Sequence, residues 1–444
     1  MNYIKRIEEE VKNNYPNEPE YVQAVLSFLE SIEGLNLDLE QLEKMAVLER
    51  LIIPERVISF RVSWLDDQNQ VRVNTGYRIQ HSSLIGPYKG GLRYHKTVNL
   101  STLKFLAFEQ TFKNALTGLL IGGAKGGSDF DPKGKSDAEI MRFSQNFMLE
   151  LYRHIGENTD VPAGDIGVGR REIGYLYGMY KKIRNESVGV LTGKHPAYGG
   201  SLVRTEATGY GLVYFVKEML KTYLDTDISH KDVIISGSGN VALYAGYKAK
   251  ELGANVIAMS NSKGHIYDPN GIDLDYIKEH QPKGDFREAY VKAHEGSSYS
   301  NDPKALYHIK CDIALPCAIQ NELDLNEAKI LVDNGCFLVA EGANMPTTSK
   351  AKAYLLKKGI LFGPGKAANA GGVSVSLLEM SQNKQHYMQT FDDVDEKLES
   401  IMKNIFNQAY EQAILINEPK NLVKGANIRA FYRLCEAMLS QGVI

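Results

Sequence analysis

The sequence has little of what marks membrane, secreted or nucleic-acid-binding proteins. Lys and Arg together number 51 against 54 Asp and Glu, so the basic excess of a dedicated nucleic-acid binder is missing. The longest apolar stretch, around residues 115–124, is interrupted by Thr and Gly and is too short to span a bilayer. The start of the chain lacks the apolar segment of a signal peptide. We therefore expect no nucleic-acid partner and no membrane association.

Cysteine is also scarce. The four cysteines are Cys311, Cys317, Cys336 and Cys435, and none stands in a C-x-x-C pair. We predict buried free thiols rather than disulfides, which is typical of a cytoplasmic protein. No residues are assigned as metal ligands.

What the 444 residues do contain is a succession of patterns that predicts two domains of the α/β class. Amphipathic helices extend to about residue 50. Alternating segments at 57–64 and 71–79, joined by the turn 66–69, predict a β-hairpin. Helices are expected at about 101–117 and 137–155, separated by a Gly-rich loop.

From residue 231 onward, short apolar strands alternate with helical segments. This alternation predicts a mostly parallel, doubly wound sheet of the Rossmann-like kind, with helices on both faces. The expected strands are residues 233–235, 256–259, 312–315, 337–340 and 360–362.

A Gly-rich turn follows the first of these strands. Residues 233–242 read V-I-I-S-G-S-G-N-V-A. Gly237 permits a tight turn, Gly239 lets a pyrophosphate approach the backbone, and the small Ala242 allows close helix packing. Free N–H groups at the helix N-terminus favour the anion. The pattern predicts a dinucleotide site, and an ordinary Gly-rich turn is the alternative.

The end of the second strand reads Ser260-Asn261-Ser262-Lys263. An NAD-selective site carries Asp or Glu there to bind the ribose 2′-hydroxyl, but no acid follows until Asp268. Ser and Lys bind a 2′-phosphate that a carboxylate would repel. We therefore expect NADP, with NAD as a second cofactor, and a solvated turn is the alternative for Lys263.

Two lysines stand among glycines, Lys89 in G-P-Y-K-G-G and Lys125 in G-G-A-K-G-G. We predict that both lie in Gly-rich loops that a ligand approaches closely. Four glycines around Lys125 indicate a constrained functional loop, and desolvation near other lysines would lower its pKa. Surface charge is the alternative for any one lysine.

Two more charged positions suit the same chemistry. Gln110, Lys113 and Thr117 share a polar face of the helix 101–117, which could meet a carboxylate. Asp165, in P-A-G-D-I-G, is a candidate proton shuttle, although an isolated Asp is more often a turn residue.

Six segments together resemble the Glu/Leu/Phe/Val dehydrogenase family, and within it the hexameric glutamate dehydrogenases of bacteria and fungi. They occur in the same order and span essentially the whole chain. The segments are GPYKGGLRY (86–94), GGAKGG (122–127), PAGDIG (162–167), EATGYG (206–211), EGANMP (341–346) and KAANAGGV (366–373).

The resemblance implies a role for each matching residue. Lys89, helped by Ser376, would pair with the substrate side-chain carboxylate. Lys125 would be the catalytic lysine and Asp165 the proton carrier. The α-carboxylate and the rest of the substrate pocket would be held by Gln110, Lys113, Arg204 and Val373. The cofactor would contact Thr208, Gly237, Ser238, Gly239, Asn240, Val241, Ser260, Ser262, Lys263, Asn344 and Asn369.

The resemblance also implies an organisation. Residues 1–199 would form the substrate-binding and oligomerisation domain, with a C-terminal helix at about 420–444 returning to it, and residues 200–419 the dinucleotide-binding domain. A homohexamer is implied, for which the N-terminal helices and the hairpin offer interface material. One departure concerns the cofactor, because many NADP-type members carry Asp where this chain has Asn261.

The expected activity is therefore reversible oxidative deamination of L-glutamate to 2-oxoglutarate and ammonium. A dehydrogenase for a branched-chain or aromatic amino acid is one alternative, and Lys89 with Ser376 argues against it because a buried cation disfavours an apolar side chain. A non-catalytic nucleotide-binding protein is another, since a fold does not fix a function.

Overall fold

The computed structural model describes residues 2–35 and 37–443, which divide into two compact units. The first unit comprises Met1–Leu202, Ser376–Thr390 and Asn427–Ile444, and the second comprises Val203–Val375 and Phe391–Ala426. The second domain expected from the sequence, residues 200–419, includes Ser376–Thr390, which the structure assigns to the first unit. That segment belongs to the first unit because side chains of its helix bind the backbone of residues 193–199.

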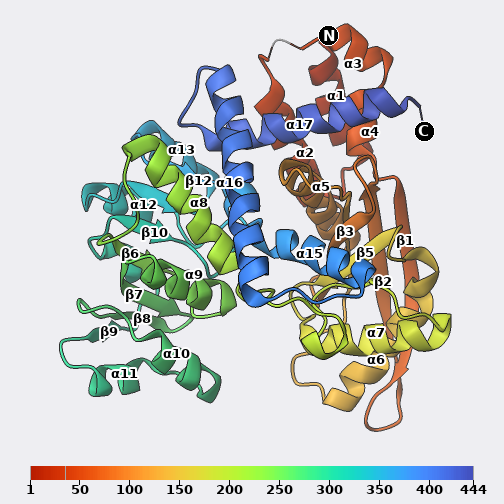
Figure 1. Ribbon diagram of the computed structural model, residues 1–444. Coiled ribbons are helices and arrows are strands. Elements are labelled where there is room, and N and C mark those ends of the chain that lie inside the picture. Colours follow the sequence, from red (N-terminus) through yellow and green to blue (C-terminus); the bar gives the residue numbers. More distant parts are fainter. Residues whose placement is uncertain (1, 36, 444) are drawn as a thin grey trace. The chain divides into compact units, whose positions relative to one another are not determined.

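The first unit begins with four helices and continues with strands and helices in alternation (Figure 1). Its elements up to residue 202 are α1 (Tyr3–Asn14), α2 (Pro19–Ile32), α3 (Leu39–Lys44), α4 (Val47–Ile52), β1 (Arg56–Leu65), β2 (Val71–Ser82), β3 (Tyr88–Tyr94), α5 (Leu100–Leu116), β4 (Gly123–Ser128), α6 (Asp137–Leu151), η1 (Tyr152–His154), β5 (Asp160–Gly164), α7 (Arg170–Arg184) and η2 (Pro196–Tyr198). The predicted helices at 101–117 and 137–155 are thus confirmed as α5 and as α6 with η1.

The five strands of the first unit form one mixed sheet in the order β1-β2-β4-β3-β5. The predicted hairpin is confirmed, since β1 and β2 pair antiparallel from Arg56↔Gln80 to Leu65↔Val71. Its turn is held by the Asp66 side chain, which accepts hydrogen bonds from the backbone N–H groups of Gln68 and Gln70 at 2.9 Å. Strands β4, β3 and β5 run parallel.

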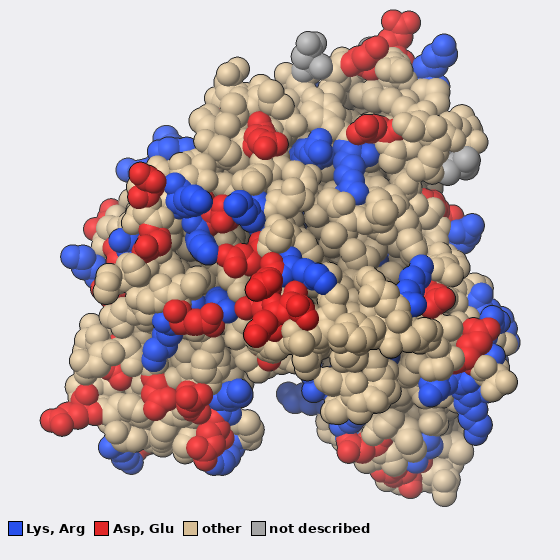
Figure 2. All heavy atoms as spheres, viewed as in Figure 1, with Lys and Arg blue, Asp and Glu red and all other residues tan. Residues whose placement is uncertain are grey.

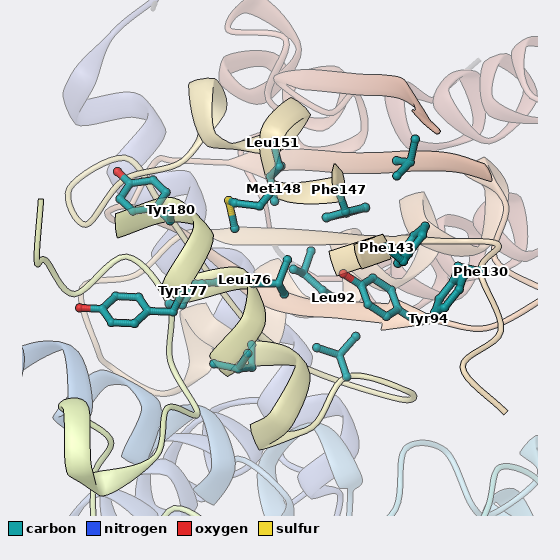
Figure 3. Packing of buried hydrophobic residues seen from close by; sticks show 14 of the residues in the cluster. Leu92, Tyr94, Phe130, Phe143, Phe147, Met148, Leu151, Leu176, Tyr177 and Tyr180 are labelled. Carbon is teal, nitrogen blue, oxygen red and sulfur yellow. The ribbon is translucent and has the colours of Figure 1, made fainter. Parts of the chain in front are cut away.

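Helices cover both faces of this sheet. On one face, α6 and α7 enclose an apolar cluster with β1 and β3, seen in Figure 3, in which the rings of Phe130 and Phe143 stack with centroids 3.8 Å apart. On the other face, Ile79 of β2 packs against Leu103 and Ala107 of α5. The sheet is therefore a buried and rigid platform for the side chains that its strands carry.

The second unit is a Rossmann-like α/β sheet with helices between the strands. Its elements are α8 (Ala207–Leu224), β6 (Asp232–Ile235), α9 (Asn240–Glu251), β7 (Asn255–Asn261), β8 (Gly264–Tyr267), α10 (Leu274–His280), η3 (Gln281–Lys283), α11 (Arg287–Ala293), β9 (Ser298–Ser300), η4 (Lys304–His308), β10 (Ile313–Leu315), α12 (Leu325–Asp333), β11 (Leu338–Ala340), α13 (Ser349–Lys357), β12 (Leu361–Gly363), α14 (Gly365–Ala368) and α16 (Phe391–Leu415). Helices α15 (Gly371–Gln385) and α17 (Leu422–Gln441) begin in this unit and continue into the first.

The strand order β12-β11-β10-β6-β7-β8-β9 confirms the predicted doubly wound sheet. All five predicted strands are present, and β12 through β7 run parallel, whereas β8 and β9 add an antiparallel edge. Two consecutive residues of β12, which point to opposite faces of the sheet, show that helices lie on both faces. Phe362 packs into the cluster that contains Leu331 of α12 and Leu355 of α13, while a Cβ on Gly363 would lie 3.1 Å from Met219 of α8.

Two further features are the state of the cysteines and the hydropathy of the helices. All four cysteines are free and buried, as predicted. Among the described residues, every helix is too short or too polar to cross a membrane.

Basic and acidic side chains are interspersed over the face drawn in Figure 2, and acidic ones gather over the start of α16, whose first turn carries Asp392 and Asp393. Acids at that position are favoured by the helix dipole.

Candidate functional site

The first unit brings Lys125 and Asp165 together. Lys125 lies on β4, and its Nζ is 3.0 Å from Oδ2 of Asp165, which follows the end of β5. The same carboxylate oxygen accepts a hydrogen bond from Nε of Arg93, on β3, at 2.9 Å. Three neighbouring strands therefore contribute one charged group each to a small cluster with two cations and one anion.

The glycines around these lysines serve close backbone packing. A Cβ on Gly90 would lie 1.6 Å from the carbonyl oxygen of Ala124, and one on Gly91 would lie 2.8 Å from Cβ of Asp165. The prediction of Gly-rich loops was wrong, because Lys89 lies in β3 and Lys125 in β4. Only glycine lets these strands and the Asp165 turn approach so closely.

Burial and charge shift the pKa values of the cluster. Burial lowers the pKa of Lys125 below that of an ordinary lysine, and the cations of Arg93 and Arg78 add to the effect against the attraction of Asp165. The neighbours responsible are thus arginines, not the lysines expected from the sequence. For Asp165, burial alone would raise the pKa, but Lys125 and Arg93 outweigh it and the pKa is lowered. Asp165 is therefore a carboxylate at neutral pH.

Lys89 is almost completely enclosed in the first unit. Only 1% of the surface of Lys89 is exposed. The ammonium donates hydrogen bonds to the carbonyl oxygen of Val161, at 3.0 Å, and to Oγ1 of Thr192, at 2.6 Å. A buried ammonium surrounded by oxygen acceptors is a suitable binding group for a carboxylate.

Helix α5 places its polar residues against the same strands. Gln110 donates to Asn114 at 2.7 Å, and Asn114 donates in turn to the carbonyl oxygens of Lys89, at 3.2 Å, and Gly122, at 2.6 Å. Lys113 is half-buried on the same helix. Gln110 is therefore tied through Asn114 to the backbone of the strand that carries Lys89.

Two residues of this region were missed by sequence reasoning. Arg93 contacts Asp165, and the signal for it was present, because Lys89, Gly91 and Arg93 alternate as they do on one face of a strand. Thr192 contacts Lys89 across 103 positions of sequence, and no local pattern pointed to it. A pocket of about 620 Å³ also opens beside Asp165, which lies on its wall with Tyr94 and Lys133.

In the second unit, the Gly-rich turn has the geometry that a dinucleotide requires. Gly237 has a φ of +89°, which favours glycine, and its N–H donates to Oγ of Ser260 at 2.9 Å. Helix α9 begins at Asn240, after Gly239 in extended conformation, and the position of a Cβ on Gly239 is open space. Backbone N–H groups at this helix start can therefore be reached by a pyrophosphate.

An acid from a distant part of the sequence, Asp285, lies beside the end of β7. Oδ1 of Asn261 accepts the N–H groups of Lys263, at 2.9 Å, and Gly264, at 3.1 Å, and Ser262 and Lys263 are exposed in this turn. The Asn261 amide lies 3.4 Å from Asp285, which forms an ion pair of 2.8 Å with Arg287. Arg287 holds the pKa of Asp285 well below its usual range, so the acid is ionised.

The other predicted residues of the second unit gather near the starts of α8 and α15. A Cβ on Gly372 would lie 2.8 Å from Oγ1 of Thr208 and 3.7 Å from Nη1 of Arg204, and Val373 is the next residue. Asn369 donates to Asn344 at 3.0 Å. The predicted residues thus form two groups. Those in the first unit are Lys89, Gln110, Lys113, Lys125, Asp165 and Ser376, and the remainder belong to the second unit.

Family models match both parts of the chain. The model described as Glu/Leu/Phe/Val dehydrogenase, dimerisation domain, matches residues 54–182. The model described as Glutamate/Leucine/Phenylalanine/Valine dehydrogenase matches residues 199–442.

Relatives are similar over the full length. A glutamate dehydrogenase of Bacteroides thetaiotaomicron is 54% identical, with 100% of each chain covered. An NADP-specific glutamate dehydrogenase of Helicobacter pylori is 52% identical, over 99% of this chain and 100% of the relative. An NAD-specific glutamate dehydrogenase of Bacteroides fragilis is 51% identical over the same shares.

Solved structures agree in fold. Plasmodium falciparum glutamate dehydrogenase superimposes with a TM-score of 0.95 at 49% identity, over 99% of this chain and 95% of that one. A hetero-hexameric glutamate dehydrogenase from Thermus thermophilus gives a TM-score of 0.85 at 28% identity, over 96% and 98%. The chain therefore belongs to the Glutamate/Leucine/Phenylalanine/Valine dehydrogenase family of amino-acid dehydrogenases.

Proposed function

We propose that this protein is a glutamate dehydrogenase, which interconverts L-glutamate with 2-oxoglutarate and ammonium using NADP(H), with NAD(H) as a second cofactor. The observation that carries the substrate assignment is the buried ammonium of Lys89 among oxygen acceptors. A substrate with a second carboxylate compensates that charge, whereas an apolar side chain would be placed against a buried cation. The names of the full-length relatives support the same activity.

The charged cluster on the first sheet supplies the chemistry of the substrate carbon. Ammonia adds to the 2-oxo group in the aminating direction, and negative charge develops on the carbonyl oxygen. The fixed ammonium of Lys125 stabilises that charge. Asp165, held by Lys125 and Arg93, takes and returns the protons that move between nitrogen and oxygen. In the aminating direction the carbonyl oxygen leaves the adduct as water, and the reduced nicotinamide cofactor, when bound, would supply the hydride that reduces the resulting iminium carbon; deamination reverses these steps.

Two further groups of residues position the ligands. Gln110 and Lys113 of α5, with Arg204 and Val373, are proposed to hold the rest of the substrate. The turn Gly237–Val241, with Ser260, is proposed to hold the cofactor phosphates and ribose. The open space at Gly239 and the start of α9 fit a pyrophosphate.

A steady-state assay tests the function directly. We expect turnover of 2-oxoglutarate with ammonium and NADPH, and a kcat/KM far above that for 4-methyl-2-oxopentanoate. Preference for the latter would favour the branched-chain alternative. Retained NADPH binding without reduction of any oxo acid would instead favour the non-catalytic alternative.

The position of Asp285 beside the end of β7 leads to a prediction about cofactor choice. A carboxylate there accepts a hydrogen bond from the ribose 2′-hydroxyl of NADH and repels the 2′-phosphate of NADPH. Replacing Asp285 by Asn removes the negative charge and frees Arg287 to bind phosphate. We expect the ratio of kcat/KM for NADPH to that for NADH to rise about tenfold. Asp302→Asn, at an exposed position of the same unit, is the matched control. A ratio equal to that of the wild type would show that Asp285 does not contact the ribose region.

We also propose a homohexamer and a cytoplasmic location. The edge strand β1 and its neighbour β2 carry exposed apolar side chains, with Val57 46%, Val71 69% and Val73 60% exposed. An unpaired edge with apolar side chains favours association with another copy. The free buried cysteines suit a reducing compartment.

The double variant Val57→Lys/Val73→Lys tests the role of this surface. Two buried charges without partners would oppose assembly, so we expect a smaller species by light scattering after size exclusion. Leu224→Lys, at an exposed apolar position of the second unit, serves as the control. A double variant with the mass of the wild type would place the interface elsewhere.

A further inference from the structure

Helix α15 is anchored to the first unit by one polar face. Glu379, Gln382 and Asn383 lie three and four positions apart, so their side chains point the same way. Gln382 donates to Oγ of Ser201 at 2.9 Å, and Asn383 donates to the carbonyl oxygen of Gly199 at 2.6 Å. Glu379, one turn earlier in the helix, contacts Gly193 and Lys194, which precede Gly199 and Ser201 in the same loop.

Glu379 forms a completely buried ion pair. Its Oε1 is 2.8 Å from Nζ of Lys194, and the two side chains are 0% and 1% exposed. The carboxylate also accepts the backbone N–H groups of Gly193, at 2.9 Å, and Lys194, at 3.3 Å, while the ammonium also donates to the carbonyl oxygen of Leu191. Removing both charges from water costs free energy that offsets their attraction, so a buried ion pair adds little to the stability of the fold. We therefore ask whether the pair serves to fix the geometry of the groups around it.

The loop that this pair holds contains the hydroxyl that binds Lys89. Thr192 Oγ1 accepts the Lys89 ammonium at 2.6 Å, and Thr192 N–H donates to the carbonyl oxygen of Pro162, on β5, at 3.0 Å. Residues 191–194 are therefore fixed between β5 and α15. On α15, Ser376 lies one turn before Glu379 and on the same side of the helix.

We propose that the Lys194–Glu379 ion pair is a positioning pair for recognition of the substrate side-chain carboxylate. Through Thr192 the pair fixes the position of the Lys89 ammonium, and through α15 it fixes the position of Ser376. This inference rests on the proposed function, in which Lys89 and Ser376 bind that carboxylate. The pair makes no described contact with Lys125 or Asp165, so its loss alters the choice and affinity of the oxo acid more than the chemical step.

The test uses a double variant that removes both charges while keeping apolar volume, Lys194→Met/Glu379→Leu. Replacing a buried ion pair in this way commonly preserves the fold, whereas removing one partner leaves a buried charge. We expect KM for 2-oxoglutarate to rise about tenfold or more, because small displacements of positioning groups have large effects. The preference for 2-oxoglutarate over 4-methyl-2-oxopentanoate should fall by a similar factor, while KM for NADPH stays within about twofold.

Gln382→Met is the matched control, because it weakens the anchoring of the same helix but contacts Ser201 rather than residues 192–194. If looser anchoring alone were responsible, this variant would lose preference as the double variant does, and the inference would be overturned. An unchanged preference in a folded double variant would also overturn it. A wild-type protein that reduces none of the oxo acids would contradict the proposed function itself.

Should the double variant fail to fold, Glu379→Gln provides a second arm. Gly193 and Lys194 donate to different oxygens of the carboxylate, so the amide keeps an acceptor for only one of these N–H groups, and it removes the negative charge. We expect the same rise in KM for 2-oxoglutarate, with Glu379→Asp recovering part of the preference. A Glu379→Gln protein with wild-type preference would argue that the charge of Glu379 does not position the site.

Discussion

Asp165→Asn is expected to lower kcat for amination of 2-oxoglutarate by about 10²- to 10⁴-fold, the usual contribution of a positioned acid–base group. The amide has the same shape and can still accept hydrogen bonds from Arg93 and Lys125, which both contact Oδ2 in the native protein. It cannot carry a proton. The loss should therefore appear in kcat, measured at saturating ammonium and oxo acid.

Cofactor affinity should not change, because the residues proposed to bind the dinucleotide belong to the other unit. The dissociation constant for NADPH, measured by fluorescence titration, checks this point. Asp137→Asn, which alters a side chain that is 75% exposed on the same unit, is the matched control and should keep wild-type turnover. An Asp165→Asn enzyme with nearly native kcat would require another proton carrier.

Much of the fold could be predicted because its signals are local. The hairpin β1–β2 shows alternation and a turn rich in Asp and Asn, and the second unit alternates short apolar strands with helices. Strands β3, β4 and β5 could not be recognised in this way. Their sequences, such as YKGGLRY and GAKGGS, are rich in glycine, which weakens a strand by itself. They are strands because they pair with neighbouring strands, and their glycines are required because α5 and those strands approach closely.

The candidate site was predictable to the same limited extent. Lys89, Lys125 and Asp165 stand in distinctive local segments, so the sequence alone singles them out. Their partners arise from distant positions: Arg93 meets Asp165 across 72 residues, and Asp285 meets Asn261 across 24. Because such contacts depend on how strands and loops are brought together, the alternation that includes Arg93 does not reveal its contact with Asp165, and no local pattern reveals the contact of Asp285 with Asn261.

Lys125→Gln has the second large expected effect. Removing a fixed charge that faces a developing oxyanion typically lowers kcat by about 10²- to 10³-fold. Asp165 keeps its ion pair with Arg93 in this variant, so the carboxylate is not left without a cation. The measurement is kcat for amination at saturating substrates, and Lys135→Gln, at an exposed position, is the control. Native turnover in Lys125→Gln would exclude an electrostatic role for this lysine.

The pH dependence distinguishes a role of the Lys125 charge from a role of its shape. Because burial lowers the pKa of Lys125, its cation is lost at a lower pH than in an ordinary lysine, and the amination rate should fall as pH rises through that value. Arginine stays protonated over the whole accessible range. Lys125→Arg should therefore have a lower kcat, because its planar group fits poorly, but lack the alkaline fall of the wild-type profile. If the same alkaline fall persists in Lys125→Arg, another group must control it, and the cation of Lys125 is not what the reaction requires.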